Sequence, residues 1–480
     1  MDPRFSRRNE YIVLVGLIFA YVSVLGFFSL LRHYNFASTG WDLGIFNQIF
    51  WNTTNGHPFE STISSTGSDN HLGKHFTPFL LLLLPGYAIF SSIDYLLIIQ
   101  TIALGVAAWP LYFFARDVLK NRLYAFSVVL AYFLYPALHG VNTYDFHIIP
   151  FAIPLFFSAF YFYAKKQWRW LFFFLLLAMT VREDIVLLVL FFGIFMVFRS
   201  GPLFSRSTWR TVSFRLGVGI ALLSLAYFIF VDFAIIPLFG GSPSQFEGYE
   251  YLGSSAGDAV FNILHDPFIL FSHIFIPLKF VYLYFLFFPV ALLPFLSFSS
   301  LLVLAPGLFE NLLSTNYHQY SIGLHYSALV IPGIFLGVVY GLKRLLYLGF
   351  NGKKLFFLFI PLAITVYHLP PGYSLSFYNH AFSNPQREEM AFVTSLVPDN
   401  VHVAASAYFA PRLSYRRRIQ TIGGEVFSQP DIILLDLEDP FGFNERVLSF
   451  DQYVAFYKNN SSYTLEEYFD RYLIFTKVDS

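Results

Sequence analysis

Long apolar runs separated by short polar stretches fill most of the first 369 residues of this chain. Most runs approach the length, about 20 residues, that a helix needs to cross the hydrocarbon core of a bilayer. They predict eleven crossings, at residues 11–31, 95–115, 123–138, 148–163, 168–181, 185–198, 216–236, 274–295, 300–313, 326–340 and 355–368. The shorter run at residues 78–90 predicts a helix lying at the membrane interface.

The pattern changes near residue 370. Long apolar runs disappear, and 23 charged residues (9 basic and 14 acidic) follow in residues 370–480. Residues 401–405 and 431–435 read as buried strands, and residues 386–396 and 448–457 as helices. The fold class expected is therefore mostly α: a polytopic transmembrane helical bundle (residues 1–369) followed by a small α/β domain (residues 370–480).

The basic residues predict the orientation of the bundle. Short loops rich in Lys and Arg stay in the cytoplasm. If the runs are threaded in order, 17 of the 30 basic residues fall on one side, namely Arg4, Arg7, Arg8, Arg116, Lys120, Arg122, Lys165, Lys166, Arg169, Arg199, Arg206, Arg210, Arg215, Lys343, Arg344, Lys353 and Lys354. We therefore expect a multi-pass protein of the cell membrane with a cytoplasmic N-terminus. Two outer loops (residues 32–93 and 237–273) and an extracytoplasmic C-terminal domain follow from the same threading.

The composition of the chain excludes several classes of protein and of functional site. Hydrophobic residues make up 56% of the chain and charged residues only 12%, against roughly 25% charged in soluble domains. The net charge is zero, so nucleic acid is not an expected partner. The absence of cysteine excludes disulfides, thiolate metal sites and thiol nucleophiles. The basic flank and first apolar run resemble a signal peptide, but the run is long enough to be a retained span.

The first outer loop is the densest source of candidate chemistry. Asp42 follows the first span and Trp41, where a carboxylate could act as a general base or simply cap a helix at residues 42–51. His71 and His75 are four residues apart, so on a helix they would share one face and could bind a divalent metal ion or a phosphate. Gly73 weakens that helix, and Lys74 adds a positive charge. No cofactor is certain, and a divalent metal ion stays an open alternative.

Further polar groups are expected at the same outer side. They are Asp145, His147, Arg182, Glu183, Asp184, Glu310, His318 and His325. Ionisable groups at membrane depth are costly and usually face a cavity or a partner. The same residues could instead form solvated turns beside an aromatic belt. A basic cluster of the C-terminal domain could bind phosphate or form a solvated face, and it consists of Arg412, Arg416, Arg417 and Arg418.

Several motifs resemble a family of uncharacterised prokaryotic polytopic membrane proteins. The resemblance covers almost the whole chain and rests on residues 40–48 (GWDLGIFNQ), 75–78 (HFTP), 181–184 (VRED), 310–314 (ENLLS), 325–326 (HY) and 411–416 (PRLSYR). More distantly, the chain resembles GT-C glycosyltransferases of the protein-mannosyltransferase and aminoarabinose-transferase type. That resemblance implies that Asp42 occupies the catalytic acidic position. The adjacent acidic pair usual in those enzymes is missing, because Trp41 and Leu43 flank Asp42.

These observations predict a membrane glycosyltransferase that uses a polyprenyl-phosphate sugar as donor. Asp42 would deprotonate the hydroxyl of a glycan, lipid or protein acceptor, and His71, Lys74, His75 or Arg182 would offset the phosphate charge. Membrane lipids are further partners. A transporter or lipid-handling protein without chemistry is the main alternative, with Glu310 lining a pathway. A structural protein whose outer domain binds surface partners is a third. The sequence has no Walker A motif or Rossmann glycine fingerprint.

Overall fold

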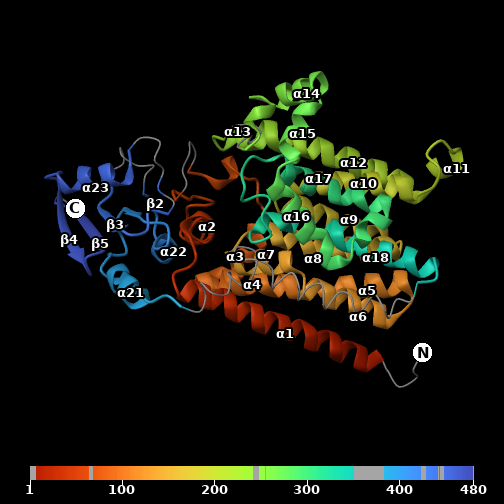
Figure 1. The fold of residues 1–480 in the computed structure, drawn as a ribbon, viewed down its shortest axis with the longest axis horizontal. Coiled ribbons are helices and arrows are strands. Elements are labelled where there is room, and N and C mark those ends of the chain that lie inside the picture. Colours follow the sequence, from red (N-terminus) through yellow and green to blue (C-terminus); the bar gives the residue numbers. More distant parts are fainter. Residues whose placement is uncertain are drawn as a thin grey trace.

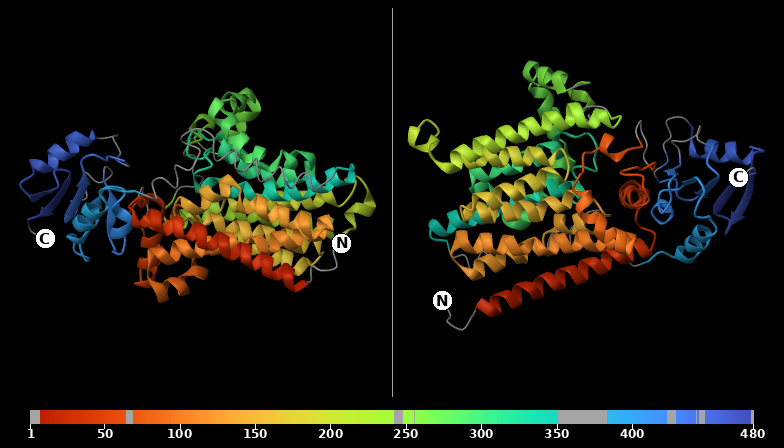
Figure 2. Two further views of the ribbon diagram at one scale, coloured as in Figure 1. Left: turned by 60° about the horizontal axis from the view of Figure 1, so that its bottom comes forward. Right: turned by 180° about the vertical axis from the view of Figure 1, so that it is seen from behind.

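The computed structural model describes residues 7–63, 69–241, 248–254, 256–350, 383–422, 429–441, 443 and 448–478. It has two parts (Figure 1). A helical bundle is followed by a small domain with a β-sheet, which lies at the end of the bundle opposite the N-terminus. Two further views show the same separation (Figure 2).

Helices make up the whole of the bundle. They are α1 (Arg7–Tyr34), α2 (Ile45–Thr54), α3 (Leu80–Phe90), α4 (Ile93–Val106), α5 (Ala108–Leu119), α6 (Arg122–Phe133), α7 (Pro136–Thr143), α8 (Ala152–Ala164), α9 (Trp168–Met179), α10 (Ile185–Arg199), α11 (Arg206–Trp209), α12 (Val212–Phe230), α13 (Ile236–Leu238), α14 (Ala256–His265), α15 (Phe268–Ile274), α16 (Pro277–Phe287), α17 (Phe298–Leu313) and α18 (Ile331–Tyr347). Ser92 and Asn121 cap α4 and α6, because their side chains accept hydrogen bonds from backbone N–H groups of the first turn.

Short helical turns of other types connect these helices. They are the π-helices η1 (Gly40–Gly44) and η4 (Val231–Ile235) and the 3₁₀ helices η2 (His71–Gly73), η3 (Ile149–Phe151), η5 (Glu250–Leu252), η6 (Phe288–Val290), η7 (Leu293–Leu296) and η8 (His325–Leu329). Isolated π turns are rare and concentrate at functional sites. Both π turns here lie beside the cavity described below.

Within the described residues, three helices are long and apolar enough to cross a membrane: Arg7–Tyr34, Ile93–Leu119 and Val212–Leu238. Two bent pairs raise the number to five if each pair is one span. Several other apolar helices, including α8, α9, α10 and α17, are shorter. The eleven crossings therefore stay a prediction. The last of them, residues 355–368, and the domain boundary near residue 370 lie outside the described residues.

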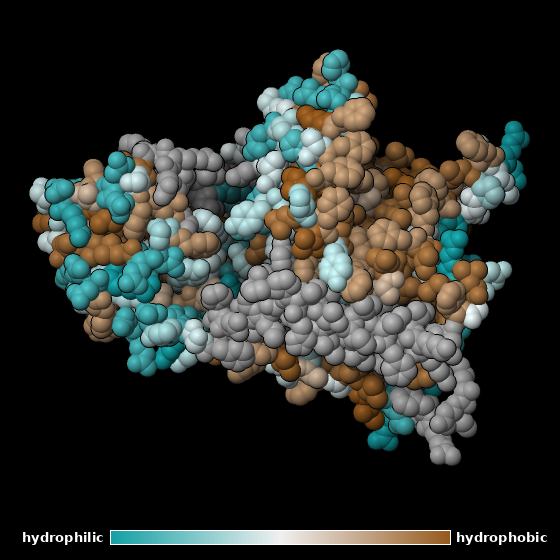
Figure 3. Space-filling view, in the orientation of Figure 1, coloured by the Kyte–Doolittle hydropathy of each residue, from teal (hydrophilic) through white to brown (hydrophobic). Residues whose placement is uncertain are grey.

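Prolines break two of the expected straight spans. The run at residues 123–138 is a pair of helices, α6 and α7, bent by 49° at Pro136. The run at residues 274–295 has no continuous helix, because α16 ends at Phe287 and short 3₁₀ turns containing Pro289 and Pro294 follow. Proline lacks the N–H that an α-helical hydrogen bond requires. On the face seen in Figure 3, apolar side chains predominate over the coloured middle of the bundle, whereas many polar side chains gather on the C-terminal domain.

The C-terminal domain has a five-stranded mixed sheet in the order β2-β1-β3-β5-β4. Its elements are α21 (Arg387–Ser395), β1 (Val403–Ala405), α22 (Ala410–Leu413), β2 (Ile419–Thr421), β3 (Ile432–Asp436), α23 (Phe450–Lys458), β4 (Tyr463–Tyr468) and β5 (Tyr472–Lys477). β1 is parallel to β2 and β3, and β5 is antiparallel to β3 and β4. The α/β character expected for this part is therefore present, with one hydrophobic cluster on each face of the sheet.

The loop after α1 joins the two parts. Gly40 N donates a hydrogen bond to Ala407 O (2.8 Å), and Asn47 Nδ2 donates one to Ser414 Oγ (2.7 Å). A Cβ atom at Gly40 would lie 2.7 Å from the Cβ of Ala410, so this position has no room for a side chain. The segment that carries Asp42 is thus held between the bundle and the C-terminal domain.

Candidate functional site

A cavity of about 740 Å³ lies beside this junction, at the end of the bundle. Its wall is formed by η1, η2, the α9–α10 turn, η4, α17 and η8. Ten of the twelve residues singled out from the sequence line it: Asp42, His71, Lys74, His75, His147, Arg182, Glu183, Asp184, Glu310 and His325. Asp145 and His318 do not belong to the lining. Segments far apart in the sequence thus bring their polar residues to one place.

Asp42 faces this cavity from the π-helix η1. The expectation that Asp42 caps a helix is wrong, because Thr39 holds the N-cap position of η1 and α2 begins only at Ile45. The carboxylate is 3.7 Å from Nδ1 of His325, and its side chain is 17% exposed. Burial, and then the negative charge of Asp145, raise the pKa of Asp42 to about 7. A carboxylate with this pKa can accept a proton near neutral pH.

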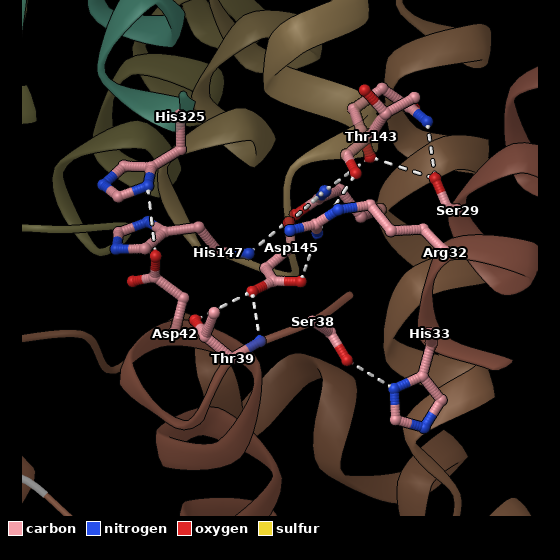
Figure 4. A network of polar contacts seen from close by, with 12 residues as sticks. Ser29, Arg32, His33, Ser38, Thr39, Asp42, Thr143, Asp145, His147 and His325 are labelled. Carbon is pink, nitrogen blue, oxygen red and sulfur yellow. Dashed lines mark hydrogen bonds and ion pairs between the residues drawn. The ribbon is translucent and has the colours of Figure 1, made fainter. Parts of the chain in front are cut away.

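Asp145 contacts Thr39, three residues before Asp42, and Arg32 of α1 (Figure 4). Its Oδ1 accepts a hydrogen bond from Nη1 of Arg32 (2.6 Å), and its Oδ2 accepts from the backbone N–H of Thr39 (3.0 Å). Arg32 lies in the last turn of α1, so the contacts of Asp145 with Arg32 and Thr39 connect the start of η1 to the first helix. Burial raises the pKa of Asp145 to about 6, although Arg32 acts in the opposite direction. Asp145 therefore positions the segment that carries Asp42.

His147 and His325 stack beside the Asp42 carboxylate, with ring centroids 3.8 Å apart and planes 5° from parallel. With Asp42 they form a group whose ligand atoms lie within 4.8 Å of one another. Nδ1 of His147 accepts a hydrogen bond from the N–H of Ile149 (3.2 Å), so the neutral ring carries its proton on Nε2. Because the two rings are nearly parallel, the in-plane lone pairs of their nitrogen atoms lie in parallel planes and do not converge on one point. The three residues fit a metal ion by distance but not by the direction of their lone pairs.

His71 and His75 do not share a helical face as the spacing suggested. η2 ends at Gly73, and the two rings lie 5.9 Å apart at 57°. His71 is buried, and its Nε2 has no hydrogen-bond partner in the described part of the chain. His75 donates from Nδ1 to Oε1 of Glu183 (2.7 Å), which fixes its ring against the α9–α10 turn. His71 therefore retains a polar atom available to a ligand.

Arg182 lies between two carboxylates on the opposite wall. Its Nε donates to Oδ1 of Asp184 (2.8 Å), and its Nη2 is 3.7 Å from Oε1 of Glu310. The guanidinium holds the pKa of Asp184 below its usual range, against the effect of burial. Of the two alternatives for this turn, a solvated hairpin tip or a polar group facing a cavity, the structure has the second: Arg182 lines the cavity, and only 8% of its side chain is exposed.

Some residues of the site were not found from the sequence. Asp232 is buried in η4 and lines the cavity, and its signal was a single carboxylate within the apolar run 216–236. Tyr249 also lines the cavity and donates to the Glu310 carbonyl oxygen (2.8 Å). Arg32 was missed because its partner, Asp145, is 113 residues away.

The charge of the lining is mostly negative. The lining contains two basic residues, Lys74 and Arg182, and five carboxylates, Asp42, Glu183, Asp184, Asp232 and Glu310. A bound phosphate would therefore be attracted to one part of the wall only, the part near Lys74 and Arg182.

The C-terminal basic cluster is not one binding surface. Arg416 is buried and donates to the carbonyl oxygens of Leu413 (2.6 Å) and Pro398 (2.9 Å). Arg412 donates to the carbonyl oxygens at the end of α1. Arg416 thus stabilises the C-terminal domain, and Arg412 stabilises its contact with α1. The sequence had suggested a phosphate site or a solvated face, and neither interpretation included these roles.

Residues 32–473 match the family described as predicted membrane protein (DUF2079). The chain belongs to this family. Its structure is similar to that of ArnT from Cupriavidus metallidurans bound to undecaprenyl phosphate, with a TM-score of 0.58 and 14% identity over 97% of this chain and 98% of ArnT. The apo form of ArnT gives a TM-score of 0.57 at 14% identity, over 98% of this chain and 99% of ArnT. No curated protein matches the sequence.

These comparisons confirm both resemblances noted from the sequence. The family is described as predicted membrane protein, and the fold of this member is similar to that of ArnT. At 14% identity the likeness concerns the fold. What the cavity does must be argued from its own residues.

Proposed function

We propose that this DUF2079 member is a GT-C-type glycosyltransferase that moves a sugar from a polyprenyl-phosphate donor to an acceptor hydroxyl on the outer face of the membrane. One observation carries the proposal: a half-buried carboxylate with a pKa of about 7 faces a cavity in a fold like that of ArnT. The cavity contains both acidic and basic groups, which transfer from a phosphate carrier requires.

The reaction assigns Asp42 the role of general base. Its carboxylate accepts the proton of the acceptor hydroxyl while the hydroxyl oxygen attacks the anomeric carbon of the sugar. The bond between that carbon and the phosphate oxygen breaks, and polyprenyl phosphate leaves with the bonding electrons. Because Asp145 and Arg32 hold η1 in place, the carboxylate is already positioned when the substrates bind.

The donor phosphate is proposed to lie near Lys74 and Arg182. They are the two basic residues of the lining. Arg182 is almost fully buried, and a charge in a buried environment acts more strongly than one in water. The Nε2–H of His147 and the unpartnered Nε2 of His71 add hydrogen-bonding groups to the same cavity. The apolar lining, which includes Phe228, Phe233 and Phe309, suits the first isoprene units of a carrier lipid.

The test is transfer by the purified full chain supplied with radiolabelled polyprenyl-phosphate sugars and a panel of glycan, lipid and protein acceptors. Wild type should label an acceptor, and Asp42→Asn should reduce the rate by at least about 100-fold, within the range expected for loss of a general base. Asp470→Asn, the same substitution on an exposed loop of the C-terminal domain, is the matched control. Full activity of Asp42→Asn would remove Asp42 from the mechanism. Donor binding with no transfer to any acceptor would favour a lipid-handling protein.

A further inference from the structure

A second cavity, of about 300 Å³, lies outside the proposed active site. It is enclosed by the last turn of α1, the first turn of α4 and the α22 segment of the C-terminal domain. Its polar wall consists of His33, Tyr34, Ser92, Asp94, Arg412 and Tyr415. None of these residues lines the larger cavity.

The position of α1 places this cavity at the membrane boundary. α1 has 28 residues, and at 1.5 Å per residue it is about 42 Å long, whereas the hydrocarbon core is about 30 Å thick. Arg7 and Arg8 begin the helix at one end, so its last turn reaches the headgroup region at the other. The cavity therefore lies where the headgroups of membrane lipids are found.

Arg412 supplies the positive side of this cavity. Its Nη2 donates to the carbonyl oxygens of His33 (2.8 Å) and Tyr34 (3.0 Å), which fixes the guanidinium against the C-terminus of α1. Among the residues that the structure describes, its buried Nε has no hydrogen-bond partner. A buried N–H of a charged group without a partner is costly and marks a place where a ligand oxygen would be favourable.

Hydroxyl groups and a helix terminus face the same space. The Oη of Tyr415 accepts from the N–H of Ile93 (2.8 Å), and the Oγ of Ser92 accepts from the N–H of Asp94 (3.1 Å). In both bonds the hydroxyl oxygen is the acceptor, so the hydroxyl hydrogens of Ser92 and Tyr415 can be donated to a ligand. The positive end of the α4 dipole favours an anion at this point.

Asp94 adds an exposed carboxylate to the rim. One cation and one anion therefore flank the cavity, and a ligand that carries both charges complements them.

We propose that this cavity binds the headgroup of a zwitterionic phospholipid with a primary ammonium group. The phosphate accepts hydrogen bonds from Arg412 and from the hydroxyl groups of Ser92 and Tyr415, and the ammonium group pairs with Asp94. A phospholipid without the ammonium group leaves Asp94 without a partner and adds no attraction to it. The lipid so bound contacts α1, α4 and α22 and fastens the C-terminal domain to the membrane. This inference does not depend on the proposed transferase activity.

The experiment measures lipid binding to the delipidated full chain by native mass spectrometry, with phosphatidylethanolamine, phosphatidylglycerol and inorganic phosphate as separate probes. Wild type should bind phosphatidylethanolamine about tenfold more tightly than phosphatidylglycerol. Asp94→Asn should abolish this preference, and Arg412→Gln should weaken binding of both lipids by about tenfold, as expected for loss of a charge-assisted hydrogen bond. Arg417→Gln, in the same basic cluster but with a 58% exposed side chain, should behave as wild type.

Each outcome of this experiment either supports or overturns the proposed lipid site. Equal binding of the two lipids by wild type, or an unchanged preference in Asp94→Asn, would overturn the proposal. Binding of inorganic phosphate as tight as that of lipid would assign the cavity to a free anion instead. If Arg412→Gln fails to fold, the exposed Asp94→Asn variant still tests the ammonium contact, and Arg412→Lys, which keeps the charge, should retain lipid binding.

Discussion

The pH dependence of transfer tests the role of Asp42 in the most detail. A general base must be deprotonated, so activity is present above its pKa and is lost as the pH falls through it. With a pKa of about 7, Asp42 is half deprotonated at pH 7, about nine-tenths at pH 8 and about one-tenth at pH 6. The rate at low donor concentration should therefore fall about fivefold between pH 7 and pH 6. The donor phosphodiester stays ionised over this range.

The fall in rate at low pH is the acid limb of the pH profile. The groups that face Asp42 predict how this limb shifts when one of them is replaced. They are Asp145, Arg182, Arg32, Tyr144 and His325, and Asp145 is the only one whose charge raises the pKa of Asp42. Asp145→Asn removes that negative charge but keeps the size of the side chain. The acid limb should therefore move to lower pH.

The assay is the initial rate of sugar transfer from pH 5 to 9 at donor concentrations well below KM, for wild type and the Asp145→Asn variant. Loss of the contacts between Asp145, Arg32 and Thr39 lowers the rate at every pH. The informative quantity is therefore the pH at which the rate falls to half its maximum, not the maximum rate. A rate that is constant from pH 5 to 7, or a limb that stays in place or moves upward in Asp145→Asn, would refute the reasoning.

Three further predictions follow from the contacts. Gly40→Ala places a Cβ 2.7 Å from that of Ala410 and should cost about 1–3 kcal/mol, measured as a lowered Tm together with slower transfer. Chelation with EDTA should leave transfer unchanged, since the Nδ1 lone pair of His147 is engaged; loss of activity restored by a divalent ion would contradict this. In this cysteine-free chain, an impermeant maleimide should label Lys458→Cys in intact cells but Trp209→Cys only after permeabilisation, and the reverse pattern would invert the orientation.

The sequence predicted regular elements well where the pattern is strong and local. The strands expected at residues 401–405 and 431–435 correspond to β1 and β3, since both are short runs of buried residues. β4 was missed because most of its side chains are exposed, so it has no apolar signal. β2 was missed because it has only three residues, and β5 was missed although its first four residues are buried.

The candidate site was predicted in its members but not in its geometry. Polar residues on an apolar chain indicated which side chains line the cavity, and this is why His147, Arg182 and His325 could be named. Sequence spacing could not show that Asp145 pairs with Arg32, because that contact depends on how α1 packs against the α7 segment. Spacing also left a capping role open for Asp42, since a π-helix has no sequence signature that separates it from an α-helix.

The central claim is that the cavity beside Asp42 holds the phosphate and sugar of a polyprenyl carrier. A cryo-electron microscopy structure of the full chain with a non-reactive polyprenyl-phosphate sugar analogue tests it most directly. We expect the phosphate beside Lys74 and Arg182, and the anomeric carbon on the side that faces the Asp42 carboxylate. A carrier bound elsewhere, with this cavity occupied only by water, would contradict it.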